Sequence, residues 1–102
     1  EIDPNYFDAY YNIGALFFNV GVKYVEEANK IPAKEIEKYD ELMSKANVEF
    51  KKSLPYMENA LKINPASKEV MDALKNIYFR FRNESPEMSA KYKEIIDKLN
   101  NM

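Results

Sequence analysis

The sequence predicts an all-α protein in which four helices form two antiparallel pairs. Two glycines and five prolines among 102 residues leave few turn positions, and this favours long helices over a many-turned β fold. Apolar residues recur along most of the chain at steps of three and four, which is the spacing of one face of a helix. We expect helices at about 4–30, 33–63, 67–82 and 86–100, so that the first pair is the longer one.

The first helix is expected to begin at Asp3-Pro4, because aspartate caps a helix and proline fits its first turn. Its inward stripe should consist of Tyr6, Tyr10, Ile13, Phe17, Val20 and Tyr24. A glycine inside a helix costs about 1 kcal/mol relative to alanine, so Gly14 should owe its place to close contact with a neighbouring helix. Pro32 ends the pattern, since proline disfavours a helical conformation in the residue before it.

The second helix carries a heptad stripe and should pair with the first as an antiparallel hairpin with coiled-coil-like packing. The stripe consists of Ile36, Tyr39, Met43, Ala46, Phe50, Ser53, Met57 and Ala60. Pro55 lies inside it and should bend the helix without ending it, because the stripe continues in phase to Leu61. The expected contacts between the two helices are those of Phe50, Ser53 and Met57 with Ile13, Phe17 and Val20.

The third and fourth helices form the shorter pair. Ser67 and Ser85 should cap them, and Pro86 suits the first position of the fourth helix. The inward residues should be Val70, Leu74, Ile77, Tyr78 and Phe81 on the third helix and Met88, Tyr92, Ile95 and Leu99 on the fourth. The opposite side of the fourth helix is charged, as is typical of the last helix of a repeat protein.

Composition argues against several classes of function. The net charge of −2 combines 15 basic with 17 acidic residues spread along the chain, without the basic face that nucleic-acid-binding proteins usually have. The longest uncharged run, 9–22, is shorter than the ~20 residues of a membrane-spanning helix, so we expect a core helix there. The chain has no Cys and no His, and it shows no Gly-rich phosphate loop or nucleophile–base pair. We therefore expect no enzymatic activity, no cofactor and no metal.

Two segments of the chain resemble the tetratricopeptide repeat (TPR), a helix pair found in helical solenoids. In 5–21 the family pattern W-x2-L-G-x2-Y is matched by Tyr10, Ile13, Gly14 and Phe17. The segment 50–65 resembles the second helix of a repeat; the matching residues are Ser53 and Ala60 at small positions, Met57 at the aromatic position and Pro65 at the closing proline. The resemblance implies a fragment of an α-solenoid. Its second unit matches more weakly, because Lys75 replaces the glycine.

The resemblance also implies how the chain is divided. All of 1–102 is expected to be one domain, in which Glu1–Pro4 looks like the tail of a preceding repeat because its ending resembles that of 62–65. A repeat follows at 5–65, and a degenerate repeat or capping pair follows at 66–102. About 27 residues within 22–49 are extra relative to an ordinary repeat, so the first hairpin should project beyond the solenoid.

TPR proteins bind partners in a concave groove formed mainly by the first helix of each pair. The resemblance therefore implies a non-catalytic scaffold that binds a peptide or protein segment on its concave face. The implied groove residues are Asp8, Tyr11, Asn12, Ala15, Phe18 and Asn19 on the first helix and Glu69, Asp72, Asn76, Phe79 and Arg80 on the third. Tyr11, Phe18 and Phe79 lie off the inward stripes, where aromatic residues are typical of binding hot spots. It stays open at this point whether these three bind a ligand or pack against a preceding repeat.

Two other kinds of site fit the sequence less well than the groove. A TPR carboxylate clamp is disfavoured, because Tyr11 replaces the matching lysine. Glu37, Glu41 and Lys45 are spaced by four, so the acidic residues of the insert indicate a solvated helix face more than an acid–base pair or a divalent-ion site.

The alternative function is an assembly module that self-associates through the extended hairpin or the exposed ends of the solenoid. The insert with Pro55 also resembles some bacterial TPR proteins, which favours a cell-envelope or periplasmic location over the cytoplasm.

Overall fold

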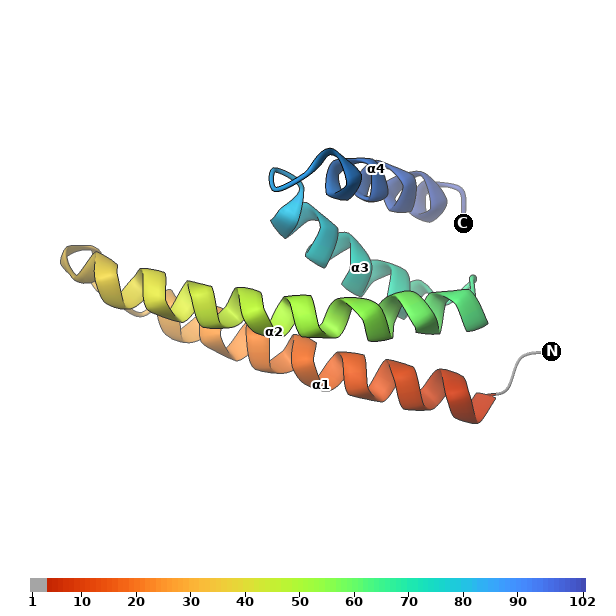
Figure 1. The fold of residues 1–102 in the computed structure, drawn as a ribbon, viewed down its shortest axis with the longest axis horizontal. Helices are drawn as coiled ribbons and strands as arrows, with labels where there is room; N and C mark the ends of the chain where they lie inside the picture. Colours follow the sequence, from red (N-terminus) through yellow and green to blue (C-terminus); the bar gives the residue numbers. More distant parts are fainter. Residues whose placement is uncertain (1–3) are drawn as a thin grey trace.

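The computed structural model describes residues 4–102, and within that range it has four α-helices (Figure 1). They are α1 (Pro4–Ala28), α2 (Ile36–Ile63), α3 (Lys68–Phe81) and α4 (Pro86–Asn100), and a 3-10 turn, η1 (Ala33–Glu35), precedes α2. The helices pair as two antiparallel hairpins, α1 with α2 and α3 with α4. The predicted all-α fold is confirmed. The predicted helix cap at Asp3 lies outside the described residues, as does most of the predicted tail 1–4.

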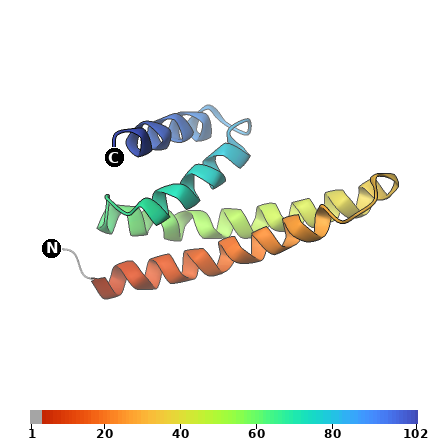
Figure 2. The same ribbon diagram turned by 180° about the vertical axis from the view of Figure 1, so that it is seen from behind.

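The shorter hairpin lies against one end of the longer one. In Figures 1 and 2, α3 and α4 cover the end at which α1 begins and α2 ends, while the other end, with η1, projects past them. The molecule is therefore elongated, with extents of 53 × 28 × 20 Å. None of the helices in 4–102 is long and apolar enough to cross a membrane.

Small residues that recur every seventh position are buried on both helices of the longer hairpin, and we call them the small-residue seam. They are Gly14, Gly21 and Ala28 on α1 and Ala46, Ser53 and Ala60 on α2. Larger α2 side chains fill the spaces over the glycines: a Cβ on Gly14 would lie 3.1 Å from Met57 Cγ, and one on Gly21 would lie 2.8 Å from Phe50 Cε1. The predicted close contact at Gly14 is confirmed.

The predicted register of α1 was wrong by one residue. Phe50, Ser53 and Met57 do pack on α1, but they meet Gly14, Phe18 and Gly21 instead of Ile13, Phe17 and Val20. Ser53 Oγ donates a hydrogen bond to Gly14 O at 2.7 Å, and the Phe18 and Phe50 rings meet edge to face with centroids 5.3 Å apart.

One residue corresponds to about 100° of rotation, because an α-helix has 3.6 residues per turn. Part of the predicted inward stripe is consequently exposed: Tyr6 is 63% exposed and Ile13 is 40% exposed. Other residues of the stripe do pack inward, as predicted: Tyr10 and Tyr24 pack against the buried clusters, and the Phe17 ring lies 5.8 Å from that of Tyr56.

The turn between α1 and α2 follows the prediction. After Ala28 the backbone tightens, with Lys30 N–H bonded to Glu27 O and Ile31 N–H bonded to Ala28 O, and Pro32 then separates the two helices. Farther along, α2 runs unbroken across Pro55, as predicted. The predicted bend at Pro55 stays a prediction.

The caps and the buried stripe of the shorter hairpin are confirmed. Ser67 Oγ accepts a hydrogen bond from Val70 N–H at 3.4 Å, and Ser85 Oγ accepts one from Met88 N–H at 3.2 Å. Every predicted inward residue of α3 is buried. These residues and Ile95 of α4 pack with α2 side chains in two clusters, one centred on Met57 and one on Phe50.

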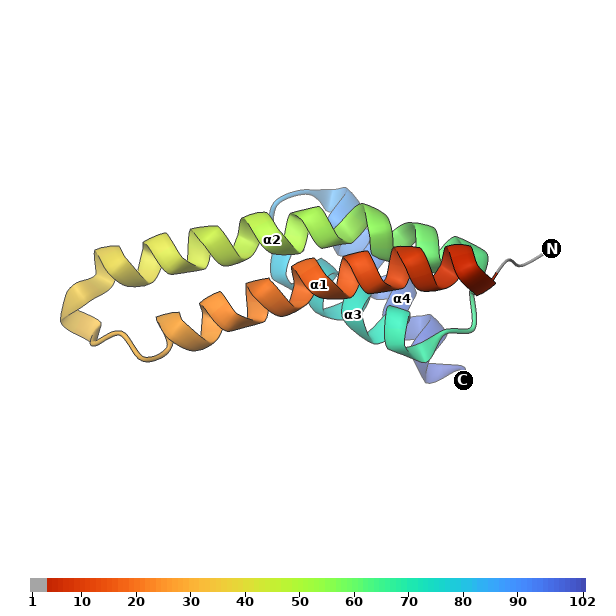
Figure 3. The same ribbon diagram turned by 90° about the horizontal axis from the view of Figure 1, so that it is seen from below.

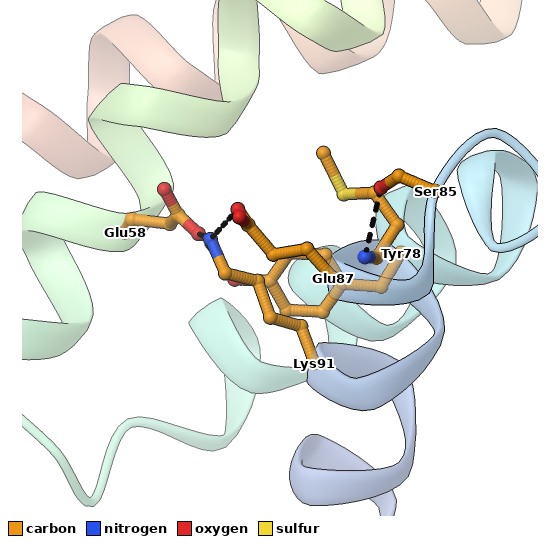
Figure 4. Close-up of polar contacts among 6 residues, drawn as sticks. Glu58, Tyr78, Ser85, Glu87 and Lys91 are labelled. Carbon is orange, nitrogen blue, oxygen red and sulfur yellow. Dashed lines mark hydrogen bonds and ion pairs between the residues drawn. The ribbon is translucent and has the colours of Figure 1, made fainter.

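Glu58 of α2 joins the shorter hairpin to the longer one (Figure 4). Its Oε2 accepts a hydrogen bond from Tyr78 OH of α3 at 2.6 Å and pairs with Lys91 Nζ of α4 at 3.0 Å. Lys91 also pairs with Glu87, one turn earlier on α4, at 3.4 Å. Burial and the hydrogen bond to Glu58 raise the pKa of Tyr78, and the hydrogen bond to the same carboxylate raises the pKa of Lys91.

Candidate functional site

Two depressions are lined by residues of both α1 and the α3 region, and we call the surface that contains them the front face. The distal depression, nearer the projecting tip, has a volume of about 380 Å³. It is lined by Phe18, Val22, Val25 and Glu26 of α1, Phe50 of α2, and Asn76, Phe79 and Arg80 of α3. The proximal depression, nearer the start of both helices, also has a volume of about 380 Å³ and is lined by Phe7, Asp8, Tyr11, Asn12, Ser67 and Glu69.

The distal depression is apolar and has one exposed aromatic ring. Phe79 is 48% exposed, and its ring lies 5.4 Å from that of Tyr92 at a tilt of 55°. Arg82 stacks on the same ring, with Cζ 3.8 Å from the centroid. A large ring that is held by two neighbours and still half exposed loses little conformational freedom when a ligand covers it, which is typical of a binding hot spot.

Arg80 supplies the positive charge of the distal depression. Its Nε donates a hydrogen bond to Asn47 Oδ1 at 2.8 Å, and its Cζ lies 4.7 Å from the centroid of the Phe50 ring. Within 4–102, no carboxylate forms a salt bridge with Arg80, and its buried Nη2 has no hydrogen-bond partner. Burial lowers the pKa of this guanidinium, because desolvation disfavours its charged form. A partly desolvated cation of this kind would be stabilised by an anionic group.

The proximal depression differs from the distal one in its charge, because it contains acidic residues and no basic residue. Its charged residues are Asp8 on α1 and Glu69 on α3, and Asn12 adds an uncharged polar group. The rings of Phe7 and Tyr11 stack nearly parallel, 6.0 Å apart, and form its apolar part. The front face is therefore acidic at one end, while the other end has one positive charge, on Arg80, and one negative charge, on Glu26.

The structure brings together most of the residues that the sequence placed in a groove. Those in the distal depression are Phe18, Asn76, Phe79 and Arg80, and those in the proximal depression are Asp8, Tyr11, Asn12 and Glu69. Three predicted residues, Ala15, Asn19 and Asp72, line neither depression. Ala15 packs against the cluster around Met57, Asn19 is exposed, and the Asp72 carbonyl accepts a hydrogen bond from Asn76 Nδ2 at 3.0 Å.

The expectation that the front-face aromatics have no place in the local core was wrong for two of them. Tyr11 packs against the cluster that includes Met57, and Phe18 packs against the one that includes Phe50. The physical reason is the one-residue shift of α1, which turns both side chains toward the neighbouring helices. Phe79 is the member of this set that stays exposed.

Sequence reasoning missed three apolar residues that line the distal depression: Val22, Val25 and Phe50. Val22 and Val25 follow Phe18 by four and seven positions, so they share its face of the helix. That periodicity could have found them, but both fall within 22–49, where the resemblance to a repeat predicts an insert.

A third depression, of about 480 Å³, lies between α2 and α4. Its polar centre is the group of Glu58, Tyr78 and Lys91, whose side chains bind one another. These contacts serve to hold the two hairpins together, and none of the predicted groove residues lies there. The front face is therefore the better candidate site.

The acidic residues of the projecting tip form pairs along the helix surface. Glu41 pairs with Lys45 at 3.6 Å, and Glu35 pairs with Lys38 at 3.0 Å, with all four side chains exposed to solvent. These pairs are those of a solvated helix face, as predicted.

Comparison of the chain with protein families, with curated protein sequences and with solved structures found no match.

Proposed function

We propose that this chain is a non-catalytic, TPR-like scaffold that binds a peptide or protein segment along the front face. The observation that carries the proposal is the distal depression, in which the half-exposed Phe79 ring and the Arg80 guanidinium, which forms no salt bridge within 4–102, lie beside apolar side chains. Small apolar sites with a few fixed polar groups are typical of ligand binding. The paired hairpins and the match of Tyr10, Ile13, Gly14 and Phe17 to the repeat pattern also support it.

The spacing of the two depressions indicates the size of the ligand. Tyr11 and Val22 are eleven positions apart on α1, which at the helical rise corresponds to about 16 Å. An extended peptide covers that distance with about five residues. We expect an apolar residue with an adjacent carboxylate at the distal depression and a basic residue at the acidic proximal one.

Selection from a library of random seven-residue peptides displayed on phage, with the full chain immobilised, tests this proposal. Binding of the selected peptides is then measured by isothermal titration calorimetry on the chain and on the Phe79→Ala and Arg80→Gln variants. Loss of a hot-spot residue costs at least about 2 kcal/mol, so we expect Phe79→Ala to weaken binding roughly thirtyfold. Arg80→Gln should weaken peptides that carry the carboxylate and leave their amide analogues unchanged.

Leu16→Ala is the matched control, because Leu16 is a large apolar residue that is 61% exposed and lines neither front-face depression. It should bind the selected peptides as tightly as the unsubstituted chain does. Peptides that bind equally well to the Phe79→Ala and unsubstituted chains would show that the front face is not the binding site.

The projecting tip favours one alternative function, which is assembly of several copies through the extended hairpin. Ile36 and Val48 of α2 are 56% and 52% exposed, and in Figure 1 the tip extends beyond α3 and α4. Sedimentation velocity at increasing concentration separates the two functions. Assembly through the tip predicts a mass above that of one chain, which Ile36→Glu with Val48→Glu should reduce to a single chain.

A further inference from the structure

Within 4–102, cationic side chains bond to polar atoms across the two hairpins at three places, and two of these contacts are ion pairs with carboxylates. The ion pairs are Lys51 with Glu84, at 2.9 Å, and Lys91 with Glu58, at 3.0 Å. The third cation, Arg80 of α3, donates a hydrogen bond from Nε to Asn47 Oδ1 of α2 at 2.8 Å. Because Asn47 is an uncharged acceptor, this contact holds the guanidinium without neutralising it.

Two side chains of α2 fix the position of the Arg80 guanidinium. The helix α3 packs against α2, as Figures 1 and 3 show from two directions. Besides the hydrogen bond to Asn47, Arg80 has its Cζ 4.7 Å from the centroid of the Phe50 ring. Arginine has a long, flexible side chain, so holding it in place before a ligand arrives lowers the entropy cost of binding.

Asn47 acts on the distal depression through Arg80. Arg80 lines that depression, whereas Asn47 does not. Glu26 is the one carboxylate among the lining residues, and it forms no salt bridge with Arg80. The charge of Arg80 is therefore held in place and left uncompensated, and a ligand carboxylate would compensate it with a charge-assisted hydrogen bond.

A contact that served only to join the hairpins would be stronger with a carboxylate at position 47. Aspartate has the same length as asparagine and its Oδ1 can accept the same hydrogen bond, and its charge would strengthen that bond. The paired guanidinium would then no longer attract an anion. The amide at this position is consequently suited to a site that keeps its positive charge for a ligand.

We propose that Asn47 is the positioning residue of the distal depression, which holds Arg80 for a ligand carboxylate and, being uncharged, leaves the positive charge of Arg80 to that ligand. This role rests on the proposed function, and it names the residue that sets the preference for an acidic ligand. A ligand that combines an apolar group with an adjacent carboxylate is then bound in preference to its amide.

The first measurement uses the full chain without a ligand. Its arginines are Arg80 and Arg82, so a ¹⁵N NMR spectrum of the arginine Nε–H groups has two signals, which Arg82→Lys assigns. Arg82 is an internal control, because it bonds to Phe79 O through Nη1 and not through Nε. We expect Asn47→Ala to speed the exchange of Arg80 Nε–H with solvent at least about tenfold and to leave that of Arg82 unchanged. Asn47→Asp should keep the slow exchange, since aspartate also accepts the bond.

The second measurement is a titration with N-acetyl-L-phenylalanine, which combines an aromatic ring with a carboxylate, and with its amide, both followed by NMR. We expect the unsubstituted chain to bind the acid about tenfold more tightly than the amide, the magnitude for a hydrogen bond to a charged group. Asn47→Ala should reduce this preference to about twofold, because Arg80 is no longer held before binding. Asn47→Asp should abolish it, although Arg80 stays held.

Asn59→Ala is the matched control for both measurements. Asn59 is also a partly buried asparagine of α2, but it lies outside the distal depression and forms no hydrogen bond with Arg80. This variant should change neither the exchange of Arg80 Nε–H nor the preference for the acid. The affinity for the amide should be the same in all of these chains, because the amide makes no use of the charge.

Unchanged exchange of Arg80 Nε–H in Asn47→Ala would overturn the proposal, and so would a preference for the acid that Asn47→Ala and Asn47→Asp leave intact. Equal affinity of the unsubstituted chain for the acid and the amide, or binding of neither, would overturn it as well. These results are distinct from a failure of the proposed function, in which Phe79→Ala binds the selected peptides as tightly as the unsubstituted chain does.

Discussion

The two hairpins are held together by opposite means. In the longer one, the Met57 and Phe50 side chains of α2 pack directly on the backbone of α1 at Gly14 and Gly21. A Cβ at either glycine would lie 2.8–3.2 Å from those side chains. In the shorter one, large side chains such as Leu74, Phe81 and Ile95 fill the interior. A seam of small residues is sensitive to added atoms, and a core of large residues is sensitive to lost atoms. The two hairpins should therefore fail under opposite kinds of substitution.

The largest effect is expected from removing atoms from the shorter hairpin. Leu74→Ala leaves a cavity at a fully buried position, and we expect the free energy of unfolding to fall by about 2–5 kcal/mol in urea denaturation. Ile13→Ala, at a position of α1 that is 40% exposed, should change it by less than about 1 kcal/mol. Equal losses at the two positions would show that Leu74 and Ile13 do not differ in burial.

Adding one methyl group to the longer hairpin should have the next largest effect. The Cβ of Gly21→Ala would lie 2.8–3.0 Å from three atoms of the Phe50 ring, which cannot bend away as a flexible chain can. We expect a net loss of about 1–2 kcal/mol, because strain outweighs the gain in helix propensity of about 1 kcal/mol.

Gly14→Ala is the matched control for this substitution. Its nearest neighbours, at 3.1–3.2 Å, belong to the flexible side chain of Met57, so the strain and the gain in helix propensity should nearly cancel. Thermal unfolding of both variants by circular dichroism measures the difference. Equal stability of the two variants would contradict the tighter contact at Gly21.

The stability contributed by the contacts of Glu58 with Tyr78 and Lys91, which join the two hairpins, should decrease at alkaline pH. The pKa of Tyr78 and that of Lys91 are both raised in the folded state, relative to ordinary values of 10.0 and 10.5. Groups with a raised folded pKa contribute stability that is fully present below the unfolded pKa and is lost as pH rises through the folded one. We expect the free energy of unfolding to fall progressively above about pH 10.

The Tyr78→Phe variant separates the contribution of Tyr78 from that of Lys91. It removes the hydroxyl that donates to Glu58 and keeps the ring, so we expect a loss of about 1–2 kcal/mol at neutral pH, the range for a hydrogen bond to a charged group. Its stability should also fall less steeply above pH 10 than that of the unsubstituted chain. Denaturation at a series of pH values checks both, and parallel curves would exclude Tyr78 as a source of the dependence.

The smallest effect is expected at the exposed pair of Lys51 and Glu84, which also joins the two hairpins. Their charged atoms are 2.9 Å apart, but both side chains are about half exposed. Glu84→Gln should therefore cost less than about 1 kcal/mol, and the cost should vanish in high salt. A larger, salt-independent loss would indicate that this pair is more than a surface contact.

The sequence correctly predicts the four helices, but it does not predict which side of α1 faces α2. Helical spacing identified all four helices, and Ser67, Ser85 and Pro86 marked where the shorter ones begin. On α1, apolar residues occur on two sides, so spacing alone could not say which side meets α2. The prediction places the longer stripe, with Ile13, inward, whereas Gly14 and Gly21 lie at the contact with α2.

The front face was predicted in part, for a related reason. A resemblance to repeat proteins placed Phe79 and Arg80 on one surface, and the structure brings them together with Phe18. Whether an aromatic ring stays exposed depends on the neighbouring helix, which the spacing within one helix does not reveal. That is why Tyr11 packs against a buried cluster, whereas Phe79 stays 48% exposed.

The seam also has a consequence for the order in which the longer hairpin folds. Gly21 meets Phe50 across 29 positions and Gly14 meets Met57 across 43, so contacts farther from the tip join residues farther apart in the sequence. Once the tip has formed, each further contact closes only a short additional loop, which costs little entropy. We expect Ala46→Gly, near the tip, to slow refolding, and Met57→Ala to act mainly by speeding unfolding. Stopped-flow measurements of both rates would detect this order, and the reverse pattern would place the nucleus at the other end.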